Sequence, residues 1–84
     1  MAPAVTDLTV REISRAAQSV LGRPVELTDE TDIARDLAVD SLALMNIVME
    51  LEDSFDISIP LDRLAQVQTI GDLSALVNEL RMKA

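Results

Sequence analysis

Apolar residues recur at helical spacing over the first quarter of the chain and predict a helix there. Thr6 and Asp7 can cap this helix, which puts its start near Thr6. Thr9 with Glu12 offers a second capping box, so the helix can also begin a few residues later. Gly22 is a natural residue just past a helix end and marks the stop. The expected apolar face consists of Val10, Ile13, Ala17, Val20 and Leu21.

A long loop is expected after the first helix. It covers residues 22–39, and a loop of this length is unusual in a compact domain unless it is functional or is packed by its own side chains. The segment 31–38 is compatible with a turn of helix. The side chains expected to anchor the loop to the core are Val25, Leu27, Ile33 and Leu37.

The second helix is expected to open at Asp40 and Ser41 and to run to about Phe55. The positions whose spacing is compatible with one buried face are Leu42, Met45, Val48, Met49, Leu51, Glu52 and Phe55. Further apolar residues make the pattern broader than a single stripe requires, namely Ala43, Leu44 and Ile47.

Two more helices are predicted in the last third of the chain. Pro60 marks a break before a short third helix over about residues 61–66. Thr69 caps a fourth helix, with Asp72 at the capping-box position. The core face of this last helix is expected to comprise Ile70, Leu73, Leu76, Val77 and Leu80.

These elements predict one all-α domain over residues 1–84, a four-helix bundle with a long loop after its first helix and a short third helix. Residues 1–5 and 82–84 are expected to be flexible. Hydrophobic residues make up 49% of the chain, which is enough to build a core without cysteine. Phe55 is the one aromatic residue, so that core is almost wholly aliphatic.

Composition excludes several classes of function. A formal charge of −8 disfavours nucleic acid and anionic lipid and favours partners with basic patches. The absence of histidine and cysteine removes the usual base, nucleophile and metal ligands, so neither catalytic residues nor a metal site are expected. No apolar run is long enough to span a membrane and no secretion signal is seen, which predicts a cytoplasmic monomer.

The segment 37–42 contains the tripeptide Asp40-Ser41-Leu42 at a predicted helix start, followed by an acidic stretch over 48–55 and an Ile-Pro break. This pattern resembles the phosphopantetheine site of acyl carrier proteins, and the likeness continues through residues 69–73. The resemblance implies an acyl-carrier-type bundle. It also implies that a phosphopantetheinyl transferase attaches a 4′-phosphopantetheine arm from coenzyme A to Ser41. The arm would then carry acyl groups as thioesters, for the synthesis of fatty acids or of specialised lipids and secondary metabolites.

The residues themselves support part of this interpretation. A phosphate attached at a helix N-terminus lies near free backbone N–H groups and the positive end of the helix dipole. Ser41 has no neighbouring base, so another enzyme must activate it. Asp40 is expected to cap the helix or orient the arm. The simpler alternative is that Asp40 and Ser41 merely cap a helix.

Between Asp36 and Asp62 the chain has no lysine or arginine, which favours a docking surface for acyl-activating enzymes, acyltransferases or synthases with basic and apolar patches. The candidate docking residues are Leu42, Leu44, Met45, Asn46, Met49, Glu50, Glu52 and Asp53. The candidates for lining an acyl pocket are Leu42, Met45, Leu51, Phe55, Ile59 and Val67.

Departures from the family pattern predict a specialised carrier rather than a housekeeping one. Ala38 stands where glycine is usual, and Arg35 stands where an acid is common. Leu44 and Asn46 make the surface near Ser41 less negative and more apolar. Two alternatives stay open at this point: a carrier of amino acids or peptides, and an unmodified helical module that binds other proteins.

Overall fold

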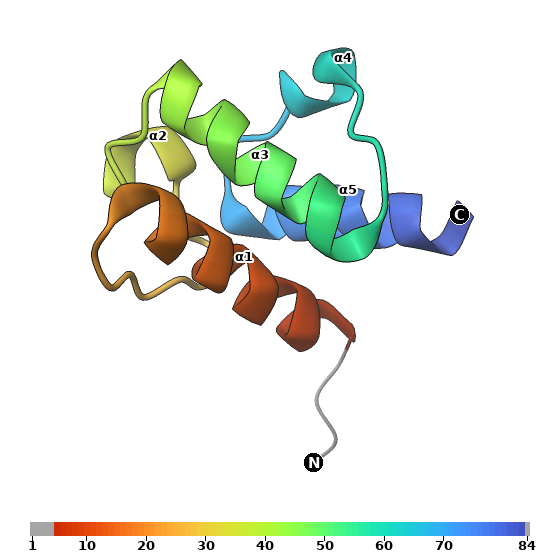
Figure 1. The fold of residues 1–84 in the computed structure, drawn as a ribbon, viewed down its shortest axis with the longest axis horizontal. Coiled ribbons are helices and arrows are strands. Elements are labelled where there is room, and N and C mark those ends of the chain that lie inside the picture. Colours follow the sequence, from red (N-terminus) through yellow and green to blue (C-terminus); the bar gives the residue numbers. More distant parts are fainter. Residues whose placement is uncertain (1–4, 84) are drawn as a thin grey trace.

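The computed structural model describes the chain from Val5 to Lys83. Its elements are the helices α1 (Val5–Leu21), α2 (Ile33–Asp36), α3 (Ser41–Phe55), α4 (Leu61–Leu64) and α5 (Ile70–Lys83) (Figure 1). Within this range the backbone forms no strand, and one isolated bridge pairs Asp32 with Thr69. The all-α prediction is confirmed, with the turn expected inside the long loop now a helix of its own.

The predicted flexible ends are only partly covered by the structure. Residues 1–4 and 84 lie outside the described residues, as do the side chains of Thr6 and Asp7, on which the expected cap depends. Val5 opens α1, and α5 continues through Met82 to Lys83. The helical backbone therefore extends into both terminal segments.

Helix α1 begins at Val5, which agrees with the predicted start near Thr6 and not with the later start at Thr9. Thr9 lies inside the helix with its side chain fully buried, and its hydroxyl donates to Oδ1 of Asn78 at 2.6 Å. The prediction of a capping box at Thr9 and Glu12 was therefore wrong, because this hydroxyl contacts α5 rather than the backbone of its own helix. The predicted stop is confirmed: Gly22 has a left-handed φ of 71° and its N–H donates to the carbonyl of Gln18.

Side-chain caps mark the starts of α2 and α5, among other helices. At α2, Oδ1 of Asp32 accepts from the N–H of Arg35, and Oδ2 of Asp36 accepts from the N–H of Asp32. These two bonds cap the start of the helix. At α5, Thr69 Oγ1 accepts from the N–H of Asp72, and Oδ2 of Asp72 accepts from the N–H of Thr69. The capping box predicted for the last helix is thus confirmed. The short helix α4 ends two residues earlier than the predicted 61–66.

The long loop is held to the start of α5 by backbone hydrogen bonds, which we call the clasp. These bonds run from Ile33 N–H to Gln68 O (3.0 Å), from Ile70 N–H to Thr31 O (2.9 Å) and from Gly71 N–H to Asp29 O (2.8 Å). The expectation that the loop is packed against the rest of the chain rather than free is met by main-chain bonding as well as by its buried side chains Ile33 and Leu37.

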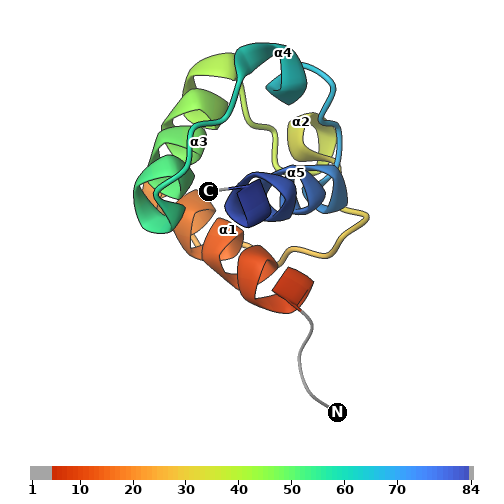
Figure 2. The ribbon, with the colours of Figure 1, turned by 90° about the vertical axis from the view of Figure 1, so that its right-hand side faces the viewer.

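In both views α5 lies between α1 and α4 (Figures 1 and 2). Helix α1 packs against α3 and α5. The core between them is aliphatic, and its fully buried large side chains include Ile13, Val48, Leu51, Ile70, Leu73 and Val77. Phe55 is half-buried at the edge of this core, with the guanidinium of Arg81 4.6 Å above its ring.

The buried face of α3 differs from the predicted one. Its buried residues are Ile47, Val48 and Leu51. Leu42 and Met49, expected on the buried face, are 72% and 61% exposed. The prediction was wrong at these two positions because α3 is apolar on several sides, so spacing alone left the orientation of the helix undetermined.

Candidate functional site

Ser41 is the first residue of α3, and its side chain is exposed. Asp40 precedes it in an extended conformation, and Oδ1 of Asp40 accepts from the N–H of Ala43 at 2.8 Å. The predicted cap is therefore present. The N–H groups of Ser41 and Leu42, as the first of the helix, have no acceptor one turn earlier. This arrangement leaves an exposed hydroxyl beside backbone donors that suit an anionic group.

The segment before Ser41 is fixed by two buried side chains and an unusual residue between them. Leu37 and Val39 are 6% and 8% exposed, which anchors the chain on both sides of Ala38. The carbonyl of Leu37 accepts from the guanidinium of Arg23 at 3.1 Å. Ala38 has a φ of 54°, in the left-handed region where glycine is favoured. Glycine is usual at this position because it adopts a positive φ without strain, whereas the backbone of Ala38 is strained there.

We expect Ala38→Gly to stabilise the protein by about 0.5 kcal/mol. A left-handed conformation costs alanine about 1–2 kcal/mol, and the greater freedom of glycine in the unfolded chain offsets about 0.4–1 kcal/mol of the gain. Urea unfolding followed by circular dichroism measures the difference. Ala34→Gly, in the short helix α2, is the control and should be destabilising by up to about 1 kcal/mol. A loss of stability in Ala38→Gly would contradict the strain.

A hollow of about 280 Å³ opens beside Ser41. Its apolar lining comprises Ile33, Ala34, Val39, Leu44 and Val67, and its polar lining comprises Asp32, Asp40, Ser41 and Gln68. Val67 is the sole acyl-pocket candidate among these residues. Sequence reasoning missed Ile33, Val39 and Leu44 as wall residues because their meeting with the distant Val67 depends on tertiary packing. Ile33 had been expected as a core anchor and Leu44 as a docking residue.

The other pocket candidates lie elsewhere. Leu51 and Ile59 are buried in the core, and Met45 and Phe55 are half-buried against it. Leu42 is exposed, so in this structure it lines no interior space, and its place among the pocket candidates is corrected. Leu42 is exposed because it lies in the first turn of α3, directly after Ser41, on the side of the helix that faces away from the core.

The docking candidates divide by exposure. One exposed row follows α3 at a spacing of four, three and four residues, and we call it the α3 stripe: Leu42, Asn46, Met49 and Asp53. Leu44 and Met45 are half-buried, with Leu44 facing the hollow beside Ser41. The stripe is apolar at two of its four positions, Leu42 and Met49, whereas Leu44, from which an apolar surface was expected, is half-buried.

The remaining acids of α3 already have partners within the chain. Oε2 of Glu52 accepts from the N–H of Ile59 at 2.7 Å and so ties the end of α3 to the segment before α4. Oε1 of Glu50 lies 3.6 Å from the guanidinium of Arg15 on α1. Arg15 also binds Glu12, and this hydrogen bond is the main reason that the pKa of Glu12 lies below its usual value. The negative charge along α3 is therefore partly compensated at its α1 edge.

A family profile described as the phosphopantetheine attachment site matches residues 11–77. A probable acyl carrier protein of Caulobacter vibrioides is 71% identical over 80 residues, which are 95% of this chain and 93% of that protein. The chain belongs to the acyl carrier protein family. Such proteins carry groups for other enzymes rather than acting as enzymes, and their prosthetic group is phosphopantetheine.

Other relatives agree with this assignment. The meromycolate extension acyl carrier protein of Mycobacterium bovis is 32% identical over 79 residues, which are 93% of this carrier and 69% of that protein. The solution structure of a holo acyl carrier protein from Geobacter metallireducens superposes with a TM-score of 0.81 at 31% identity and covers 89% of this carrier and 87% of that chain. The predicted family, fold and cofactor are confirmed.

The residues at the start of α3 fit the prosthetic group. Attachment needs an accessible hydroxyl and room beside it, and the exposed Ser41 in the lining of the hollow offers both. Among the described residues, no group of three or more histidine, cysteine or acidic side chains is placed to hold a metal ion. No helix in the described part of the carrier is both long and apolar enough to cross a membrane.

Proposed function

We propose that Ser41 is the attachment residue, and that the carrier holds acyl groups as thioesters on a phosphopantetheine arm at the start of α3. The observation that carries this proposal is an exposed serine hydroxyl directly after a capping aspartate, in the lining of the hollow. The family assignment supplies the cofactor, and the exposed position of Ser41 makes it the accessible hydroxyl at this helix start.

The attachment step belongs to a separate transferase. The hydroxyl oxygen of Ser41 attacks the phosphorus of coenzyme A that bears the pantetheine, a new P–O bond forms, and the phosphoanhydride bond breaks. The bisphosphorylated adenosine leaves, and the transferase takes up the serine proton. Ser41 has no histidine anywhere in the chain to act as its base, so it is a nucleophile only in the transferase active site.

Incubation with coenzyme A and a broad-specificity phosphopantetheinyl transferase tests the proposal by intact-protein mass spectrometry. We expect a gain of one phosphopantetheine group in the native chain and no gain in Ser41→Ala. Ser58→Ala, which also removes an exposed serine hydroxyl, is the matched control and should be modified as the native chain is. A native chain that stays unmodified would instead indicate a helical module that only binds proteins.

We further propose that this carrier serves a dedicated lipid or secondary-metabolite pathway through partners with an apolar docking patch. Support comes from the α3 stripe, in which Leu42 and Met49 expose apolar side chains next to Ser41 and on the following turns. A relative with 32% identity is by its name a meromycolate extension carrier, which shows that specialised carriers occur among similar chains.

Acidic substitutions on the stripe test this second proposal. Leu42→Glu with Met49→Glu is expected to lower the rate of acyl transfer to the cognate synthase about tenfold, which corresponds to roughly 1.4 kcal/mol of lost contact. Transfer to a synthase that prefers acidic carriers should not fall. Leu8→Glu makes the same change at an exposed leucine of α1 and should leave both rates unchanged. An equal fall with both synthases would contradict a specialised surface.

A further inference from the structure

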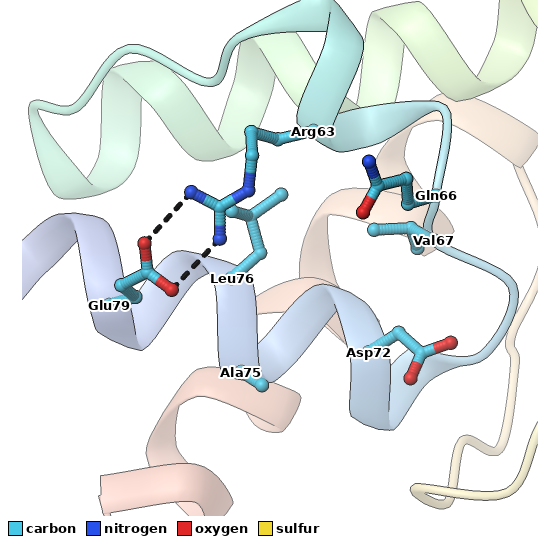
Figure 3. Close-up of a pocket in the computed structure, with 7 residues that line it drawn as sticks. All are labelled: Arg63, Gln66, Val67, Asp72, Ala75, Leu76 and Glu79. Carbon is cyan, nitrogen blue, oxygen red and sulfur yellow. Dashed lines mark hydrogen bonds and ion pairs between the residues drawn. The ribbon is translucent and has the colours of Figure 1, made fainter.

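A groove of about 210 Å³ lies between α4 and α5 (Figure 3). Val67 and Leu76 form part of its apolar lining, and Arg63 of α4 reaches across it to Glu79 of α5 (Figure 3). Val67 also lines the hollow beside Ser41. The two spaces are therefore neighbours that share one half-buried side chain.

The contact across the groove is a two-point ion pair. Nη1 of Arg63 donates to Oε2 of Glu79 at 2.9 Å and Nη2 donates to Oε1 at 2.8 Å. Parallel bonds of this kind are stronger and more directional than a single contact. The hydrogen bond from Arg63 is the main cause that lowers the pKa of Glu79 to about 2, with a further contribution from Lys83. The pair is therefore fully charged at neutral pH.

Helix α4 has few other attachments. Its N-cap is Pro60, which makes no side-chain capping bond, and Leu64 is the one buried residue of the helix. Leu61 is 65% exposed. Among the described residues of α4, Arg63 is the one that forms an ion pair with α5. Helix α4 is thus joined to α5 by this ion pair and to the buried core by Leu64.

We propose that the Arg63–Glu79 pair is a latch that holds α4 against α5 and sets how well an acyl chain attached at Ser41 is sheltered from the surrounding solvent. The proposal rests on the proposed function of Ser41. A long acyl chain entering the hollow meets Val67 and the groove beyond it, which the latched α4 covers. A chain of two carbons ends before this region and is not affected by the latch.

Hydrogen exchange of the protein without its arm tests the latch itself. We expect Arg63→Gln and Glu79→Gln each to speed exchange of the amides of residues 64–67 about two- to fivefold, the size typical for losing a partly exposed pair. Lys83→Gln is the matched control, because Lys83 contacts the same carboxylate from within α5 and does not bridge to α4. The exchanged pair Arg63→Glu with Glu79→Arg should restore slow exchange.

Thioester reactivity tests the role in sheltering. The arm-bearing protein is loaded with an octanoyl or an acetyl group, and the rate of thioester cleavage by hydroxylamine is measured. We expect Arg63→Gln to speed cleavage of the octanoyl form about two- to fivefold and to leave the acetyl form unchanged. Equal effects on both chains, or none on the octanoyl form, would overturn the sheltering role.

The outcomes separate the two proposals. Unchanged exchange over residues 64–67 in both single variants would overturn the latch whatever happens at Ser41. Failure to add the arm would overturn the proposed function of Ser41 and with it the sheltering role, while the exchange experiment would still decide whether Arg63 and Glu79 hold α4 in place.

Discussion

Leu51→Ala is expected to lower the free energy of unfolding by about 3 kcal/mol, within the range of about 2–5 kcal/mol for leucine in a close-packed core. Leu51 is 0% exposed and lies on the face of α3 that contacts the core with Ile47 and Val48. Truncation removes apolar burial and leaves a cavity that neighbouring aliphatic side chains fill only in part. For so small a domain this is a large share of its total stability.

Met49→Ala is the control for this prediction, because it shortens an exposed side chain of the same helix. Met49 lies two residues away on the same helix and is 61% exposed, so its loss is expected to cost less than about 0.5 kcal/mol. Urea denaturation of both variants measures the two effects. Equal losses would mean that α3 is rotated about its axis relative to the structure, because the sequence pattern alone places both side chains on one face.

Gly71→Ala is expected to lower the free energy of unfolding by about 1–2 kcal/mol. A methyl group at this position would lie 2.9 Å from the carbonyl oxygen of Asp29 and 3.2 Å from its Cβ. That oxygen accepts the N–H of Gly71 in the clasp, so it has little freedom to withdraw. Crowding of this kind costs about 1–3 kcal/mol, which outweighs the gain of up to about 1 kcal/mol from alanine as the better helix former.

Gly22→Ala is the control that distinguishes a steric clash from a strained backbone conformation. A methyl group at Gly22 would meet nothing within 4 Å, and its cost arises from the φ of 71° alone. Hydrogen exchange at Ile70 and Gly71 should therefore rise in Gly71→Ala and stay unchanged in Gly22→Ala. Slow exchange at both amides in Gly71→Ala would contradict the close approach of the loop to α5.

Helix ends were the features most open to prediction from the sequence. Gly22, Asp40 and the pair Thr69 and Asp72 mark ends through hydrogen bonds made within a few residues, so local sequence suffices to find them. Thr9 is the exception, since its hydroxyl bonds to Asn78, which a local pattern cannot indicate. Ser41 was singled out in a different way, through the resemblance of Asp40-Ser41-Leu42 and the segments after it to acyl carrier proteins, because a residue next to a cap is not by itself a site.

The space around Ser41 could not be predicted in this way. Its walls combine Ile33 and Val39 from the long loop with Leu44 of α3 and Val67 from the far side of α4. Their meeting depends on tertiary packing, which periodicity does not encode. The exposed residues Leu42 and Met49 were placed on the predicted buried face for a related reason: a helix that is apolar on several sides fits the core in more than one rotation.

The clasp has a consequence for the order of folding. It joins segments some forty residues apart, such as Thr31 and Ile70, whereas α3 depends mainly on contacts one turn apart. Distant contacts of this kind form at a higher entropic cost and therefore later than local ones. The residues beside Ser41 come from both sides of the clasp, so the hollow is complete only when the clasp has closed. Under the proposed function, we therefore expect the helix that bears Ser41 to form before the hollow that would shelter an acyl chain is complete.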